Sequence, residues 1–277
     1  MTGFINVNKE TGVSSAFAVN RIKRLAKTPA GHMGTLDPLA SGVLPVAIGN
    51  ACRLFDYFSD KKKTYLARFR FGVTTETLDG EGEKEFKGNI PSFREIENAL
   101  PSLTGKIMQI PPAYSAKSVN GVRSYNLARA GKQVELAPKE VEIFSFRLTE
   151  QTAPDEFAFE IVCGSGTYIR ALARDIAANL GTYAYMSRLE RTASGIFTLE
   201  SAVSLERLTA ENIGQYLIPT EEVLPYPVLD LESDRVFNGL SERIECADGF
   251  YKLYRRGKFY GIASVTDGFA KAVKKLC

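Results

Sequence analysis

The order of its strand and helix patterns is the feature of this sequence that most constrains the fold. Residues 63–72, KTYLARFRFG, alternate between two faces, which is the period of a strand with one buried side. The apolar face carries Tyr65, Ala67, Phe69 and Phe71. A short strand pattern opens the segment at residues 3–15, before a turn at Gly12. Further strand patterns cover residues 44–49, 106–112, 139–148, 156–166 and 183–192. Because helical segments interrupt these strands irregularly, the sequence predicts an α+β fold with a mixed, largely antiparallel sheet rather than a doubly wound parallel sheet.

Helix patterns fall between the strand patterns. The clearest is YIRALARDIAANLG at 168–181, which has apolar residues at helical spacing and Gly181 as its stop. An earlier helix has Ser14 or Ser15 in the N-cap position. That helix covers residues 16–26, and further helix signals are the capping-box spacing SFRE at 92–95 and SYNLARAG at 124–131. Residues 79–82, DGEG, predict a turn.

A domain boundary is expected at residues 221–232, EEVLPYPVLDLE, where two prolines interrupt the pattern. We therefore divide the chain into a large domain over residues 1–224 and a small β-rich module over residues 225–277. Within the module, FYKLYRRGKFYGIASV predicts two strands that turn at Arg256-Gly257.

The composition is that of a soluble globular protein, with 44% hydrophobic and 24% charged residues. No apolar run approaches the roughly 20 residues of a membrane span. The first ten residues lack the basic and then apolar pattern of a signal peptide. These features predict a cytoplasmic protein with no membrane partner.

The cysteines and the single histidine exclude the commonest metal sites. Zinc needs clustered ligands, whereas the four cysteines lie far apart and none is near His32. The cysteines are Cys52, Cys163, Cys246 and Cys277. The sequence therefore predicts no metal, and it disfavours metal-dependent and histidine-based hydrolysis.

Basic residues are clustered although the formal net charge is only +3. The clusters are RIKRLAK at 21–27, KKK at 61–63, RRGK at 255–258 and KAVKK at 271–275. Such clusters are compatible with a polyanionic partner, but charged runs are also common on solvated surfaces. The charge alone leaves both interpretations open.

Residues 31–44, GHMGTLDPLASGVL, place the only histidine, His32, five residues before Asp37 in an apolar, loop-like segment. An acid in such a turn costs desolvation free energy unless a neighbour compensates it. Asp37 therefore either caps a turn or takes part in chemistry. A His–Asp pair is also compatible with a hydrolase, but no Gly-x-Ser-x-Gly nucleophile elbow accompanies it.

Four motifs in one order carry a family resemblance. They occupy residues 31–49, 63–65, 111–131 and 163–181. Over about residues 3–224 the chain resembles the bacterial TruB-type tRNA pseudouridine synthases. The resemblance implies isomerisation of uridine to pseudouridine at position 55 in the TΨC loop, with the tRNA T-arm as partner. This reaction needs neither redox change nor net addition of water, so we expect no cofactor, and no obligate protein partner is evident.

The resemblance also implies the reacting group. The family's aspartate nucleophile corresponds to Asp37, and the arginine that grips it corresponds to Arg170. A cation in contact holds a carboxylate ionised, and a guanidinium suits a bidentate grip better than an ammonium does.

Four further residues match positions at which the family holds the flipped nucleotide. Tyr65 corresponds to the stacking aromatic, although the strand pattern alone favours a core residue on the face of Phe69. Tyr168 corresponds to the pocket tyrosine and Leu189 to an apolar pocket wall. His32 corresponds to the residue that contacts the backbone phosphate of the flipped nucleotide.

The segment at about 109–133 resembles the family's RNA-gripping insertion. It offers Lys117, Arg123 and Arg129 to phosphates, although ordinary solvated charges are an equal alternative. Asn8 and Glu10 depart from the family's aspartate and proline beside the active site. By position and β character, residues 225–277 resemble a short PUA-like RNA-binding module.

Two other functions remain possible from the sequence. The chain could be a non-catalytic RNA-binding or tRNA-folding protein, which would need neither Asp37 nor Arg170. It could also be a pseudouridine synthase for other RNA sites, because no residue by itself encodes the choice of the T-loop.

Overall fold

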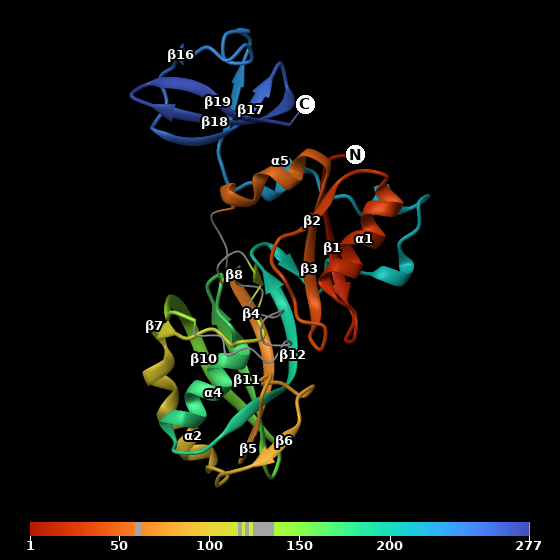
Figure 1. Cartoon of the computed structure of the whole chain (residues 1–277). Helices are drawn as coiled ribbons and strands as arrows, with labels where there is room; N and C mark the ends of the chain where they lie inside the picture. Colours follow the sequence, from red (N-terminus) through yellow and green to blue (C-terminus); the bar gives the residue numbers. More distant parts are fainter. Residues whose placement is uncertain (59–61, 116–117, 120–121, 124–135, 277) are drawn as a thin grey trace.

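The computed structural model describes residues 1–58, 62–115, 118–119, 122–123 and 136–276. Two main sheets organise these residues (Figure 1). A ten-stranded sheet forms the body of the molecule, and a five-stranded sheet lies at one end of it. Helices pack on the large sheet, so the predicted α+β class is confirmed.

The large sheet contains the strands β1 (Gly3–Lys9), β2 (Ala30–His32), β3 (Ser41–Ile48), β4 (Lys63–Phe71), β7 (Gly105–Gln109), β10 (Lys139–Ala153), β11 (Glu156–Cys163), β12 (Ala184–Ser194), β13 (Phe197–Thr198) and β14 (Val203–Ser204). Its main path runs β14-β1-β3-β12-β4-β11-β10-β7. The pairs β1–β14 and β12–β3 are parallel, and the other pairs along this path are antiparallel. The sheet is therefore mixed and largely antiparallel, as the sequence predicts.

Strand β4 follows its alternation closely. Its predicted apolar face, from Tyr65 to Phe71, is buried in the main core, whereas Leu66 on the other face is 43% exposed. The neighbours β11 and β12 both run antiparallel to β4. As a result β4 crosses the middle of the sheet, and its Tyr65 belongs to the main core.

The helical segments are α1 (Ser15–Ala26), α2 (Phe93–Ala99), α4 (Ile169–Asn179) and α5 (Thr220–Val223), together with the 3₁₀ segments η1 (Gly49–Tyr57), η2 (Leu100–Leu103), η3 (Leu205–Arg207) and η4 (Ile213–Tyr216). Ser14 is the N-cap of α1, since its hydroxyl accepts a hydrogen bond from the backbone N–H of Phe17 at 3.1 Å. The capping box of α2 is present at Ser92 and Glu95.

Helix α4 packs on β12 and β4, and α2 packs on β10 (Figure 1). The apolar positions of α4, including Leu172 and Ile176, are fully buried. Gly181 follows the helix with φ of +66°, a conformation that favours glycine. Local pattern and tertiary packing thus agree, and the first turn of α4 is held firmly beside the sheet.

The C-terminal sheet contains β15 (Val228–Leu231), β16 (Glu242–Arg243), β17 (Gly249–Arg255), β18 (Lys258–Thr266) and β19 (Phe269–Lys275), in the order β15-β17-β18-β19-β16. The predicted turn at Arg256-Gly257 joins β17 to β18, and both residues have positive φ, as a two-residue hairpin turn requires. A separate apolar cluster packs this sheet against η1, through contacts that include Leu54 and Ile262.

The segment 31–44 is less loop-like than its composition suggests. Gly31 and His32 extend β2, which pairs with Ala47 and Val46 of β3, so that the irregular part shrinks to residues 33–40. Backbone pairing with β3 overrides the high glycine content here. The predicted helix at 124–131 lies outside the described residues.

Two small pairs of antiparallel strands complete the described elements. They are β5 (Val73–Thr75) with β6 (Lys84–Phe86), and β8 (Ser118–Val119) with β9 (Val122–Arg123). The predicted turn at residues 79–82 lies between β5 and β6. Within the described parts of the chain, no helix is both long and apolar enough to span a membrane.

Candidate active site

A cavity of about 730 Å³ opens where the loop at residues 34–39 meets β4, β12 and the start of α4. The turn at residues 77–81 and the segment at residues 165–168 close its other sides. Five of the residues singled out from the sequence line this one cavity, namely Asp37, Tyr65, Tyr168, Arg170 and Leu189. Elements that are far apart in sequence therefore converge on a single site.

The loop that carries Asp37 is fixed from both sides. The Ser15 hydroxyl donates to the Leu36 carbonyl at 2.7 Å and accepts from the Leu36 N–H at 2.9 Å. The Gly12 N–H donates to the Pro38 carbonyl at 2.8 Å. Leu36 is buried in the core, whereas the Asp37 side chain keeps 34% of its surface exposed. The carboxylate is thus presented to the cavity on a well-anchored turn.

Lys9, at the end of β1, fastens this loop to the preceding turn. Its buried amine donates to the carbonyls of Val13 at 2.7 Å, Glu10 at 2.9 Å and Ala40 at 2.5 Å. Burial lowers the pKa of Lys9 to about 8, and the charge of Asp37 opposes that shift. Glu10 replaces the family's proline, but it joins this network through its backbone carbonyl while the residue itself is exposed.

Arg170, in the first turn of α4, contacts two carboxylates at once. Its Nε lies 3.0 Å from Oδ2 of Asp37, a charge contact that is not aligned as a hydrogen bond. Its Nη1 lies 3.2 Å from Oδ2 of Asp79 and donates to the Thr77 carbonyl at 3.0 Å. Its Nη2 donates to the Tyr114 carbonyl at 3.0 Å. Arg170 is 6% exposed, so the Asp37–Arg170 pair forms in a largely desolvated wall of the cavity.

Asp79 is a site residue that the sequence analysis treated only as part of a turn. Its carboxylate accepts from the Thr77 hydroxyl at 2.6 Å and from the Glu81 N–H at 3.1 Å, besides its contact with Arg170. A buried charge with this many donors is well compensated. Asp79 therefore helps to orient the guanidinium that contacts Asp37, and both carboxylates line the cavity.

Tyr65 and Leu189 occupy the sheet floor of the cavity. Tyr65 of β4 pairs with Arg191 of β12, and Leu189 pairs with Ala67, so both side chains face the same side of the sheet. Tyr65 is a member of the main core and also lines the cavity, so the two interpretations of this residue are compatible. Burial raises the pKa of its hydroxyl, which stays protonated at neutral pH.

Arg191 is a second residue that the sequence analysis missed. It is fully buried, and its guanidinium donates to the carbonyls of Val43 at 2.7 Å, Gly34 at 3.1 Å and Thr35 at 3.4 Å. These contacts fix the N-terminal side of the loop, opposite the side held by Lys9. The loop that carries Asp37 is therefore supported by two buried cations.

Tyr168 is the N-cap residue of α4, and Gln109 positions it. The Gln109 side chain accepts from the Tyr168 N–H at 2.8 Å and donates to the Tyr168 carbonyl at 3.2 Å. Chiefly through burial, the pKa of the Tyr168 hydroxyl is raised. The cavity thus contains a protonated phenol close to Asp37 and Arg170.

His32 lies on β2, beside the cavity rather than among its lining residues. Its Nδ1 is buried and has no hydrogen-bond partner among the described residues. Burial, followed by the charge of Arg191, lowers its pKa, and Lys63 adds to the effect. His32 is therefore a neutral imidazole in a cationic neighbourhood.

The structure describes only part of the segment at about 109–133 that carries the three candidate phosphate contacts. Arg123 is in β9, and its side chain is not described, whereas Lys117 and Arg129 lie outside the described residues. Where the structure describes the chain, it contains no group of three or more His, Cys, Asp or Glu side chains that could hold a metal ion.

The alternation of the strands contained a signal for Arg191 and Lys9, the two buried cations that the sequence analysis did not single out. On β12 the alternation that turns Leu189 inward also turns Arg191 inward, and on β1 the burial of Val7 extends to Lys9. A charged residue in register with a buried strand face is rare unless it is paired or hydrogen-bonded. Such positions are therefore candidates for internal support of a site.

Comparison with known proteins identifies the family. The model described as "TruB family pseudouridylate synthase (N terminal domain)" matches residues 22–169, and the "tRNA pseudouridylate synthase B C-terminal domain" model matches residues 170–232. The chain is 38% identical over 287 residues to "tRNA pseudouridine synthase B" of Clostridium kluyveri, covering 99% of each chain. It is 41% identical to the Clostridium perfringens strain 13 protein of that name, covering 100% of this chain and 99% of the relative. The chain belongs to the TruB family of pseudouridylate synthases, which are isomerases.

Solved structures agree on the fold. "Structure of H/ACA RNP bound to a substrate RNA containing 2'-deoxyuridine" matches with a TM-score of 0.71 at 21% identity, covering 99% of this chain and 85% of the other. "Crystal Structure of a Cbf5-Nop10-Gar1 Complex" matches with a TM-score of 0.69 at 24% identity, covering 95% and 78%. At these identities the likeness concerns the fold alone.

Proposed function

We propose that this chain isomerises uridine to pseudouridine at position 55 in the TΨC loop of tRNA, with Asp37 as the nucleophile. The observation that carries this proposal is the contact between Asp37 and a buried Arg170 in the wall of a cavity large enough for a nucleoside. The relatives named tRNA pseudouridine synthase B support the choice of tRNA. The position within the tRNA follows from the family resemblance.

In this reaction the C1′–N1 bond breaks, the base rotates, and C1′ joins C5, which loses its proton while N1 gains one. The Asp37 carboxylate attacks C1′ or C6, and either route needs an ionised oxygen beside the nucleoside. Arg170 supplies the compensating charge, and Asp79 keeps the guanidinium in place. No step calls for a metal or a redox cofactor.

The target base must leave the RNA stack to reach Asp37. Tyr65 and Leu189 offer an aromatic face and an apolar wall on the same side of the sheet. Stacking on an aromatic side chain contributes about 1–3 kcal/mol per base. Tyr168 faces the same cavity and can hold a proton or a hydrogen bond near the rotating base.

We propose residues 1–224 as the catalytic domain, with an RNA-gripping insertion at about 109–133. Residues 225–277 then form a PUA-like RNA-binding module. The change from the large sheet to the C-terminal sheet at Val228 supports this division. Lys117, Arg123 and Arg129 remain our candidates for phosphate contacts, and the cytoplasm remains the expected location.

The direct test is tritium release from C5-labelled uridine in an unmodified T-arm stem-loop, followed by mapping of the pseudouridine. We expect release at the uridine that corresponds to position 55, and none from a stem-loop in which cytidine replaces it. Binding without release would support the non-catalytic RNA-binding alternative. Release only from other RNAs would show that the chain acts on a different site.

A further inference from the structure

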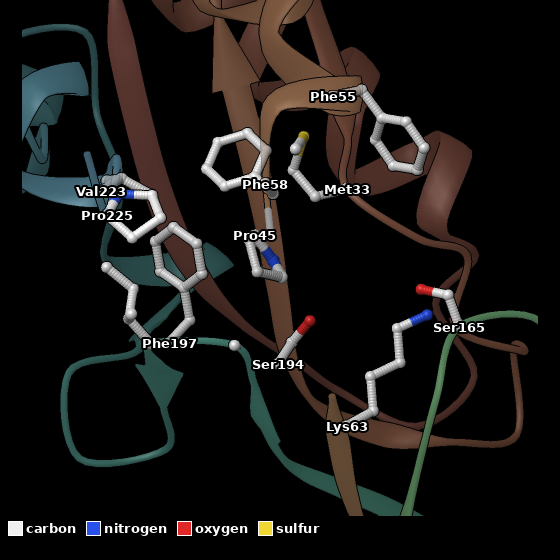
Figure 2. A pocket seen from close by; sticks show the side chains of 12 residues that line it. Met33, Pro45, Phe55, Phe58, Lys63, Ser165, Ser194, Phe197, Val223 and Pro225 are labelled. Carbon is white, nitrogen blue, oxygen red and sulfur yellow. The ribbon is translucent and has the colours of Figure 1, made fainter. Parts of the chain in front are cut away.

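Lys63 lies where the large cavity meets a smaller one. The smaller cavity, of about 60 Å³, shares Phe55, Lys63 and Ser165 with the large one. Figure 2 shows the Lys63 amine and the Ser165 hydroxyl at one end of it, apart from the ring of Phe197 at the other. The amine of Lys63 therefore lies where the two cavities share their lining.

The surroundings of this amine are cationic. Gly34 has φ of +131°, and a Cβ atom there would lie 3.0 Å from Nζ of Lys63 and 3.9 Å from Nη1 of Arg191. The charge of Lys63 also helps to lower the pKa of His32. Across the described residues, no carboxylate lies within ion-pair distance of Lys63. A cluster of positive groups without a counterion is unfavourable until an anion arrives.

We propose that Lys63 binds a backbone phosphate of the target nucleotide and positions that nucleotide for attack by Asp37. This inference rests on the proposed function, because it requires the target base to enter the large cavity. With the base against Tyr65, two residues along β4, the attached sugar and its phosphate come within reach of Lys63, which lines the same cavity. Lys63 is thus a substrate-positioning residue in the motif at residues 63–65, where the family resemblance gave a role only to Tyr65.

The phosphate should change the protonation of Lys63. Burial and the charge of Arg191 lower the pKa of Lys63 to about 8 in the free protein. An adjacent phosphate favours the protonated form and so raises that pKa. Binding of RNA then takes up a proton above about pH 8, and the affinity falls as the pH rises through this range.

The groups that face Lys63 do not account for a fall in RNA affinity as the pH rises through about 8. The guanidinium of Arg191 from β12 lowers the pKa of Lys63, and burial raises the pKa of the Cys163 thiol of β11 to about 11. His32 from β2 has a pKa below its ordinary value and is neutral above pH 7. Lys9, with a pKa of about 8, lies on the other side of the loop and is common to all variants of Lys63.

The test compares RNA affinity at pH 7 and pH 9 in a protein that also carries Asp37→Asn, so that the T-arm stem-loop is not converted. For this parent we expect a loss of about tenfold in affinity between the two values, as one site of pKa about 8 requires. Lys63→Arg keeps the positive charge at both pH values, because a guanidinium does not titrate in this range. This variant should bind RNA well at pH 7 and pH 9 and lose most of the pH dependence of the affinity. Lys63→Gln should bind weakly at both.

Lys62→Gln is the matched control, because it removes a neighbouring positive charge that lies over the ring of Phe144. It should retain the parent's pH dependence. Any effect of pH on the RNA itself is the same for all variants and cancels in the comparison. Far-ultraviolet circular dichroism verifies that each variant is folded. An unchanged pH dependence in Lys63→Arg, or parental affinity in Lys63→Gln at pH 7, would show that Lys63 does not bind phosphate.

Tritium release by the wild-type chain, measured in parallel, separates this inference from the proposed function. If the wild-type chain releases tritium normally and the Lys63 variants bind RNA as the parent does at both pH values, only the role of Lys63 is overturned. Absence of release from every T-arm substrate, with normal Lys63-dependent binding, overturns the proposed reaction and leaves the phosphate contact standing.

Discussion

Replacing Arg170 by lysine distinguishes a guanidinium that grips carboxylates from a cation that only contacts phosphate. Arg170 makes four polar contacts, to Asp37, Asp79 and the carbonyls of Thr77 and Tyr114. Lysine keeps the charge, but its single nitrogen ends about one bond short of the two Nη atoms. It can therefore stay near one carboxylate while losing most of the other contacts.

The structure sets the size of the two expected effects. Asp79 is buried and would lose its cation, but it would keep the Thr77 hydroxyl and the Glu81 N–H as donors. We expect the free energy of unfolding to fall by about 2–4 kcal/mol, somewhat less than for a buried pair broken outright. A displacement of Asp37 by about 1 Å should lower the single-turnover rate by about 10²-fold or more.

The assay is single-turnover tritium release, with RNA binding at several salt concentrations and urea unfolding alongside. Arg174→Lys is the matched control, because Arg174 lies one turn later in α4 and pairs with Asp175 at 2.7 Å on a partly exposed surface. It should react at nearly the parental rate. An Arg170→Lys protein with an unaltered single-turnover rate and only a salt-dependent loss of binding would refute the carboxylate grip.

Three further predictions concern the walls of the cavity and its cofactors. Tyr65→Ala should lose base capture and turnover, and Tyr65→Phe should bind RNA almost normally; an alanine variant that turns over like the parent would leave Tyr65 a core residue only. Lys9→Met should lower the free energy of unfolding by about 1–3 kcal/mol in urea and slow tritium release, because the carbonyls of Val13 and Ala40 lose their donor; equal stability and rate would show that Lys9 does not support the loop. Turnover of a prefolded stem-loop should survive EDTA, and loss of activity restored only by zinc would contradict a cofactor-free reaction.

The fold was predictable where the signal is local. The alternation of β4, the capping box at Ser92 and the turn at Arg256-Gly257 each depend on residues within a few positions of one another. The extent of β2 was not predictable in this way, because a glycine-rich segment becomes a strand only through its pairing with β3. Tertiary pairing decided that segment.

The site was predictable only where the family resemblance reached. Asp37 and Arg170 are 133 positions apart, and no local pattern joins them. Asp79 was missed because the composition around it indicates only a turn. Its partner, Arg170, lies 91 positions later in the sequence. Lys9 and Arg191 were missed because their function is to hold backbone carbonyls, which leave no trace in the sequence of the loop that they support.

The measurement that tests the central claim most directly is single-turnover tritium release by Asp37→Asn, with RNA affinity measured on the same preparation. Asparagine keeps the shape of the side chain, and the backbone contacts that anchor the loop at Leu36 and Pro38 do not involve the carboxylate. We expect tritium release to vanish while the stem-loop still binds, because the nucleophile is lost and the loop is preserved. Sustained release by a clean Asp37→Asn preparation would contradict the assignment of Asp37 as the nucleophile.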